Sequence, residues 1–222
     1  MKAIERFFST MKRSKALLTV YRDGDGAERN DDFLRFAIVL SVAAFERYVK
    51  DAFLAHLVTS LRKEPCNENL QKLVVDSGIT SDFWRQCILK KTPHPFQRIC
   101  NAVKRHLFAF PCQKKSAIDG LFKCYSLGSL VDNTRSKSRR KTLWRSIEWA
   151  VKRRHQIVHA GDCGNMGHLA LITIRETEHR LDDIELFVTN MDEIVRNKFS
   201  RKKKRRKKKP RASTRKRNPI SY

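Results

Sequence analysis

The amino-acid sequence predicts an all-α protein that ends in a basic tail. Apolar residues recur at helical spacing, for example Ile4, Phe7 and Met11, and the sequence holds no set of alternating strands separated by turn signals. A chain of 222 residues can bury one sizeable core. We therefore expect one folded helical domain at residues 1–199 and a disordered polybasic tail at residues 200–222.

The helices of the first two thirds can be placed from prolines, capping residues and the apolar pattern. A first helix ends before the segment RDGDGAERND. A long second helix begins after Asn30 or Asp31 and runs to about Arg62, ahead of Pro65. Shorter helices are expected near residues 68–76, 81–91 (with Thr80 or Ser81 as its cap), 96–109 and 115–127, followed by a basic loop at 132–141.

The last third contains two further predicted helices. The first spans about Thr142 to Ala160, and Gly161 follows it, the residue type that commonly terminates a helix. Residues 168–175 are expected to be extended or to form a short strand. The final helix is strongly amphipathic, and its apolar face comprises Ile184, Phe187, Val188, Met191, Ile194, Val195 and Phe199.

The charge of the chain indicates a polyanionic partner. Lys and Arg number 48 against 23 Asp and Glu, which gives a net charge of +25. Residues 200–222 hold 13 basic residues and no acidic ones, so residues 1–199 carry 25 − 13 = +12. Because both parts are cationic, nucleic acid is the first candidate partner, ahead of an anionic membrane surface. The basic run of the tail comprises Arg201, Lys202, Lys203, Lys204, Arg205, Arg206, Lys207, Lys208 and Lys209.

Two functions can be considered for this tail. It can capture RNA, ribosomes or DNA electrostatically, with an affinity that falls as salt rises, or it can serve as a solubilising or localisation segment. We favour capture, because the remainder of the chain is also basic.

The sequence gives no sign of export or membrane insertion. The longest apolar run, FAIVLSVAAF, is far shorter than the roughly 20 residues that a bilayer requires. The start MKAIERFF does not resemble a signal peptide. The six cysteines are widely spaced and lack a C-x-x-C pair, so we expect reduced thiols and a cytoplasmic protein.

The segment VKRRHQIVHAGD at residues 151–162 places basic groups across the apolar stripe of its helix. At about 100° per residue, Arg154 falls in the centre of the stripe that starts at Leu143, whereas His159 lies about 140° away from Arg154. A guanidinium cannot deprotonate, and burying it unpaired is costly. Arg154 should therefore meet a carboxylate or face a cleft or another subunit. Either the helix loosens before Gly161, or two copies of the motif meet across an interface.

The same residues also have purely structural interpretations. Arg154 could form a buried ion pair with Glu46, and His155 and His159 could be polar helix-end residues that the helix dipole favours. On physical grounds alone, this interpretation ranks slightly ahead of catalysis.

Metal sites are not expected. His155 and His159 share a helix face and could bind zinc with His168 or Asp162 as a third ligand, but HQIVH lacks the glutamate of the H-E-x-x-H motif. The acidic segment DGDGAERND lacks the ligand pattern of a calcium loop. Three tryptophans could stack on bases, but tryptophans in helices are more commonly core or interface anchors: Trp84, Trp144 and Trp149.

The run RRHQIVHAGD resembles the R-x4-6-H signature of the HEPN superfamily. Arg154, the polar His155 and His159 fit R-x4-H, and Arg153 gives an R-x5-H spacing. The early helical stretch VLSVAAFERYVKDAF and the late order of elements are similar to the RiboL-PSP-HEPN branch. The likeness covers roughly residues 30–199.

This resemblance implies a HEPN-type helical bundle that dimerises so that two motifs line one cleft. It also implies a metal-independent endoribonuclease without cofactors, often a toxin or defence effector with an antitoxin or defence-system partner. His159 would then be the acid/base and Arg154 the phosphate ligand, with Arg153 and His155 as support and Glu46 as an orienting partner or a structural ion pair. An imidazole and a guanidinium suit RNA cleavage by the substrate's own 2′-hydroxyl.

Two other functions remain open from the sequence. The chain could be a non-catalytic RNA-binding or nucleotide-binding HEPN module in a larger assembly, because a fold does not fix an activity. It could also be a structural interaction protein in which Arg154 specifies how two subunits pair.

Overall fold

The computed structural model describes residues 2–24, 30–89, 91, 93–163 and 167–207. Within these residues the protein folds into nine helices without a strand, so the all-α prediction is confirmed. None of the described helices is both long and apolar enough to cross a membrane.

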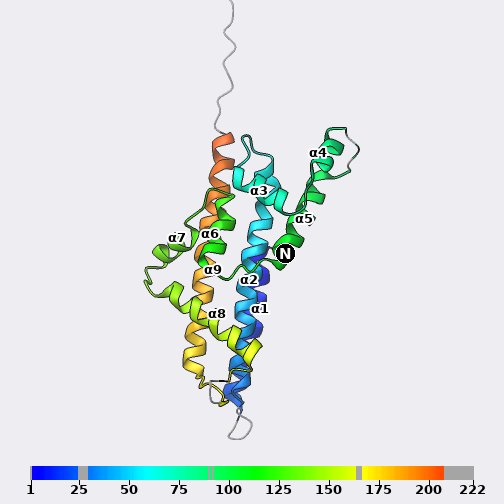
Figure 1. Ribbon diagram of the computed structural model, residues 1–222. Coiled ribbons are helices and arrows are strands. Elements are labelled where there is room, and N and C mark those ends of the chain that lie inside the picture. The colour runs from blue at the N-terminus through cyan, green and yellow to red at the C-terminus, as the bar shows by residue number, and fades with distance from the viewer. Residues whose placement is uncertain (1, 25–29, 90, 92, 164–166, 208–222) are drawn as a thin grey trace, which may run out of the picture.

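Three long helices run side by side and form the main body, as Figure 1 shows. They are α1 (Ala3–Asp23), α2 (Asp32–Leu61) and α9 (Ile174–Lys207), and α8 (Leu143–Ala160) packs obliquely across α2 and α9. The apolar pattern drives this packing, since the residues predicted to form the apolar faces of α1 and α9 are mostly buried. Phe8, which follows Phe7 on α1, is exposed over 42% of its surface.

Aromatic side chains join the long helices at the centre of the core. The Phe187 ring of α9 contacts Phe45 of α2 at 5.8 Å between ring centroids and Trp144 of α8 at 5.5 Å. Phe45 and Phe187 are fully buried, and burial of one such ring stabilises the fold by roughly 1.5–3 kcal/mol. These contacts fix the position of α8, which carries the basic motif.

Five shorter helices connect α2 to α8. They are α3 (Glu68–Asp76), α4 (Ser81–Ile88), α5 (Pro95–Ala109), α6 (Lys115–Lys123) and α7 (Leu130–Ser138). Figure 1 shows α4 and the start of α5 standing away from the main body on one side and α7 on the opposite side. The Thr80 side chain accepts a hydrogen bond from the Phe83 amide at 3.3 Å, which confirms the predicted cap of α4.

The prediction of a basic loop at 132–141 is wrong, because α7 occupies most of that stretch. Leu130, Val131 and Thr134 are buried, so the first turn of α7 is anchored in the core. The Asp119 carboxylate also accepts a hydrogen bond from the Val131 amide at 2.9 Å. The charged residues after Thr134 hid this helix, because only its first turn carries an apolar signal.

Other boundaries also differ from the prediction. Helix α4 ends at Ile88 and α6 ends at Lys123, several residues earlier than expected. The predicted extended segment is non-helical up to Thr173, but its only pairing within the described residues is an isolated bridge between Cys163 and Leu169. Helix α9 continues to Lys207, past the predicted domain boundary at residue 199. The rest of the predicted tail, 208–222, lies outside the described residues.

Candidate functional site

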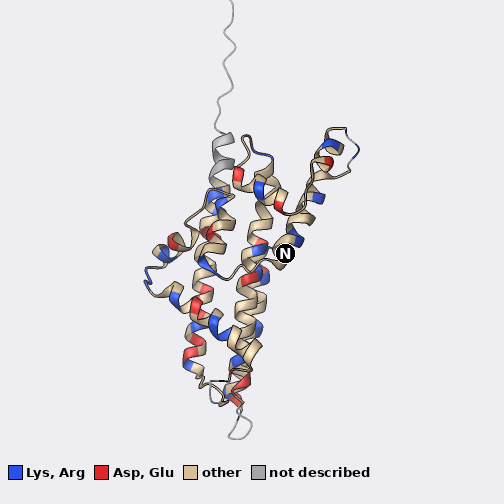
Figure 2. Cartoon of the chain, viewed as in Figure 1, with Lys and Arg blue, Asp and Glu red and all other residues tan. Residues whose placement is uncertain are grey.

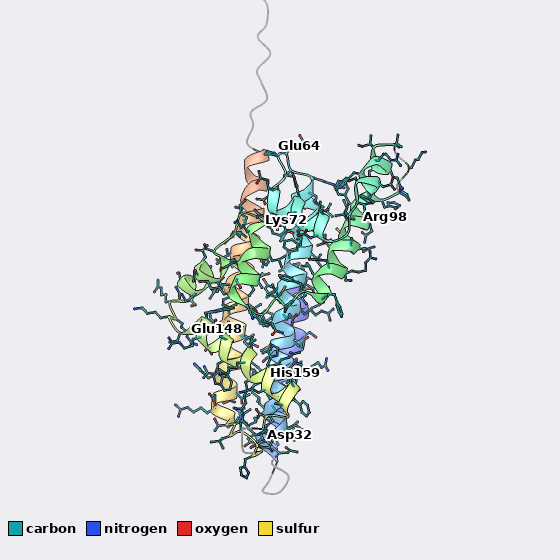
Figure 3. All side chains as sticks on the ribbon, viewed as in Figure 1. Asp32, Glu64, Lys72, Arg98, Glu148 and His159 are labelled. Carbon is teal, nitrogen blue, oxygen red and sulfur yellow. The ribbon has the colours of Figure 1, made fainter. Side chains whose placement is uncertain are left out.

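The predicted motif occupies the last two turns of α8. The helix remains regular to Ala160, so the alternative in which it loosens before Gly161 is wrong. Arg154 is half-buried, whereas His155 and His159 are exposed on another face with their ring centroids 5.4 Å apart. Figure 3 places His159 on the end of α8 that lies over α2. Within one chain, Arg154 and His159 therefore point in different directions.

Arg153, the adjacent basic residue, belongs to a buried ionic cluster. We name this the Asp162 cluster, consisting of Arg35, Arg153 and Asp162. The Asp162 Oδ2 atom accepts hydrogen bonds from Arg35 Nε at 2.7 Å and from Arg153 Nη2 at 2.8 Å. The three side chains are 6%, 11% and 1% exposed, respectively. Arg153 therefore has a structural partner within its own chain.

Backbone carbonyls accept further hydrogen bonds from the two arginines. Both guanidinium groups donate to the Ala170 carbonyl at 3.0 Å, and Arg153 also donates to the Leu171 carbonyl at 3.1 Å. The cluster thus ties α2, the end of α8 and the segment before α9 together. Within the described residues, Asp162 Oδ1 and Arg153 Nε are buried without a hydrogen-bond partner.

A left-handed turn brings Asp162 back under the helix. Gly161 and Asp162 have φ values of 59° and 61°, and glycine and aspartate both tolerate this conformation. Both of their amides donate to the Gln156 carbonyl, which closes the end of α8. The predicted stop at Gly161 is confirmed.

Glu46 lies on α2 within electrostatic reach of Arg154. Its carboxylate accepts hydrogen bonds from Lys50 at 2.7 Å and from Gln113 at 2.6 Å. Partial burial acts to raise the pKa of Glu46, but these hydrogen bonds and the charges of Lys50 and Arg154 together hold that pKa below its ordinary value. The structure therefore relates Arg154 to Glu46 through their charges, and the direct partners of Glu46 are Lys50 and Gln113.

The zinc alternative lacks a ligand set in the structure. Asp162, one of its suggested third ligands, is already bound by two arginines. Among the described side chains, no group of three or more His, Cys, Asp or Glu could hold a metal ion.

The tryptophans occupy three different environments. Trp144 is buried in the core, and Trp84 is 42% exposed on α4. Trp149 is half-buried on α8, and the guanidinium of Arg180 lies 4.6 Å from its ring centroid. Trp144 thus follows the expectation of a core residue, and Trp149 forms a cation–π contact beside the motif.

Sequence reasoning missed Arg35 and the structural role of Asp162. A signal for Arg35 was present, because this cation stands within the apolar run FLRFAIVL of α2. The sequence suggests for Asp162 only the role of a third zinc ligand. Its pairing with Arg35 joins residues that are 127 positions apart, so it could not be read from local spacing.

A comparison with protein families agrees with this architecture. The model of the RiboL-PSP-HEPN family matches residues 4–197, which is most of the chain. The chain belongs to the RiboL-PSP-HEPN family. Searches of the curated proteins and of the solved structures returned no significant match.

The family match covers the helices that carry the candidate site. In this RiboL-PSP-HEPN domain, α2 supplies Arg35 and Glu46, and α8 supplies Arg153, Arg154 and His159. The side chains are able to bind a phosphate and to exchange a proton, which are the two operations that RNA cleavage by internal attack requires.

Proposed function

We propose that this protein is a metal-independent endoribonuclease of the HEPN type, with Arg154 and His159 as its catalytic residues. The observation that carries the proposal is the different environment of two neighbouring arginines, Arg153 and Arg154. Arg153 is held by the buried Asp162, whereas Arg154 is half-buried and its charge acts on Glu46. This favours the R-x4-H spacing over the R-x5-H spacing in a domain of the RiboL-PSP-HEPN family.

The proposed reaction uses the 2′-hydroxyl of the RNA. An imidazole removes the proton of this hydroxyl, the 2′-oxygen attacks the adjacent phosphorus, and the bond from phosphorus to the 5′-oxygen breaks. A second imidazole returns a proton to the leaving 5′-oxygen. The products carry a 2′,3′-cyclic phosphate and a 5′-hydroxyl. Arg154 binds a non-bridging phosphate oxygen and stabilises the charge that develops in the transition state.

A homodimer would supply both imidazoles. In the proposed assembly, the motifs of two protomers line one cleft, so that Arg154 and two copies of His159 converge. Exposed apolar residues around the Asp162 cluster support such an interface. Phe36, next to Arg35, is 56% exposed, Val158 is 47% exposed and Leu171 is 83% exposed.

Cleavage assays with three variants test the site. We expect the parent protein to cleave RNA in the presence of EDTA, and Arg154→Ala and His159→Ala to lose this activity while keeping their helical circular dichroism. Lys152→Ala is the matched control, since Lys152 is an exposed cation on the same helix. Equal cleavage by all four proteins would refute the assignment. Tight RNA binding without turnover by the parent would instead favour the non-catalytic RNA-binding alternative.

The proposed biological setting is a cytoplasmic toxin or defence effector. An antitoxin or defence-system partner would control such a nuclease, and the polybasic tail would add electrostatic capture of RNA. Controlled expression in a bacterial host tests this role. Growth arrest with the parent and normal growth with His159→Ala are the expected results, and equal growth would contradict the toxin role.

A further inference from the structure

One helix outside the α8 motif presents an exposed cationic face. We name it the α5 outer face, and it comprises Gln97, Arg98, Asn101, Lys104, Arg105 and Phe108, all of which are exposed. At about 100° per residue, these six positions fall within an arc of about 120°. The opposite side of α5 is buried through Ile99, Ala102, Val103 and Leu107. The arrangement therefore follows directly from the amphipathic pattern of the helix.

The α5 outer face has the chemistry of a nucleic-acid surface. The helix contains no Asp or Glu, and Figure 2 shows basic positions along it. Within the described residues, no carboxylate forms an ion pair with Arg98, Lys104 or Arg105. Phe108 leaves 86% of its surface exposed, in line with the cations. An uncompensated row of cations next to a bare aromatic ring matches phosphates and an unstacked base.

Hydrogen bonds connect this helix to the candidate active site. The Lys50 Nζ atom donates to the Phe108 carbonyl at 3.3 Å and to the Glu46 carboxylate at 2.7 Å. Burial acts to raise the pKa of Glu46, and the hydrogen bonds from Lys50 and Gln113 act to lower it. The charge of Arg154 adds a smaller effect that also lowers this pKa. The C-terminal end of α5 is thus linked through Lys50 to Glu46, one of the supporting residues of the proposed site. The N-terminal end of α5 points away from the candidate site, and Figure 3 places Arg98 on this N-terminal part of the helix.

We propose that the α5 outer face is the docking track for single-stranded RNA, which it guides toward Arg154 and His159. This inference rests on the proposed ribonuclease function and names the surface that holds its substrate. Lys104 and Arg105 bind phosphates, Phe108 stacks on a base, and the amides of Gln97 and Asn101 face base edges. Single-stranded RNA is the occupant because an exposed aromatic ring can stack only on a base that is not already stacked in a duplex.

Binding measurements separate this track from general electrostatic attraction. The probe is a fluorescent single-stranded RNA oligonucleotide, and all proteins are full-length and carry His159→Ala to prevent cleavage. We expect Lys104→Gln with Arg105→Gln to weaken binding about tenfold and to reduce the slope of log K against log salt by about 1.4. The matched control is Arg139→Gln with Lys141→Gln, which removes the same charge beside α7 on the opposite side of the protein. The control should bind nearly as well as the His159→Ala parent.

Phe108→Ala tests the stacking contact independently of charge. This variant should bind the oligonucleotide about tenfold more weakly with an unchanged salt slope. Photocross-linking with RNA that contains 4-thiouridine should label peptides that include Phe108. Cross-links confined to residues 200–222, or equal affinities of the α5 and α7 variants, would overturn the proposal. A changed oligomeric state of the α5 variants in solution, together with unchanged RNA affinity, would also overturn the proposal, because the α5 outer face would then be a protein interface.

The failure of this inference is distinguishable from failure of the proposed function. Cleavage by the parent protein reports on the catalytic assignment, whereas RNA binding by the His159→Ala proteins reports on the track alone. Binding that depends on Lys104 and Arg105 without any parental cleavage would support the track and refute the nuclease.

Discussion

Arg35 and Asp162 form a buried ion pair that joins the beginning of α2 to the turn after α8. The Arg35 Nε atom lies 2.7 Å from Asp162 Oδ2, and both side chains are almost fully shielded from solvent. The remaining nitrogens of Arg35 donate to Asp32 and to the Ala170 carbonyl. The same aspartate binds Arg153. Asp162 therefore offsets the buried positive charges of Arg35 and Arg153 and holds the end of α8 in place.

Removal of the Asp162 charge should destabilise the protein strongly. Asp162→Asn leaves the buried guanidinium of Arg153 without a counter-charge and that of Arg35 with only the exposed Asp32, so we expect the free energy of unfolding to fall by about 3–5 kcal/mol. Urea denaturation measures this change. Asp82→Asn is the matched control, because it removes the same charge from the exposed pair with Arg85 and should cost less than about 1 kcal/mol. Similar losses for both variants would contradict the structural role of the Asp162 cluster.

A shared cleft that uses two imidazoles predicts that one defective subunit inactivates the whole dimer. In a mixed dimer of the parent chain with His159→Ala, the cleft keeps only one His159, so RNA cleavage should fall far below half of the parent activity. The two chains are co-expressed with different affinity tags and the mixed dimer is purified for RNA cleavage assays. The parent dimer and the His159→Ala dimer serve as the controls. A mixed dimer that keeps half of the parent activity would show that each chain cleaves RNA on its own.

Glu46 should make part of the stability dependent on acidic pH. The folded state holds the pKa of Glu46 below its ordinary value of about 4.3, although burial opposes this shift. The unfolded chain therefore takes up a proton first as pH falls. This contribution is fully present above the unfolded pKa and is lost as pH falls through the folded pKa. Denaturation curves should show a smaller loss between about pH 5 and about pH 3 for Glu46→Gln than for the parent. An equal loss would contradict this role of Glu46.

His56 should produce a second pH dependence near neutrality. Its ring stacks on Phe199 at 3.8 Å between centroids, and burial together with the charge of Lys63 lowers the pKa of His56. The stability from the neutral ring is present above the ordinary pKa of about 6.5 and is lost as pH falls through the lower folded pKa. His56→Phe keeps a stacked ring without a titrating group. Its denaturation midpoint should change less than that of the parent between about pH 7.5 and about pH 5.5, and an identical change in both would exclude His56 as the source.

Long helices with strong apolar stripes could be predicted well from the sequence. The predicted second helix corresponds to α2, from Asp32 to Leu61, and the Gly161 stop is found where expected. Helix α7 was missed, because its stability depends on burial of Leu130, Val131 and Thr134 against other helices and much less on its charged second half. A local sequence pattern contains the apolar stripe of a long helix, but it does not contain the burial of a short helix against other helices.

The candidate site was only partly predictable. The R-x4-H spacing named Arg154 and His159 directly, and helical geometry placed them on different faces, which the regular α8 retains. The sequence gave Arg153 only an R-x5-H spacing to His159 and no indication of its partner. Arg35 and Asp162 meet Arg153 only after α2 and the turn beyond α8 have packed together.

The sequence by itself determined the helical class, the strong positive charge, the family motif and the angular separation of Arg154 from His159, because composition and helical periodicity are local properties. Tertiary structure alone decided which arginine is neutralised in the interior. Asp162 can accept Arg35 and Arg153 only when segments distant in the chain are brought within hydrogen-bonding distance, and the desolvation of these charges makes that choice energetically decisive.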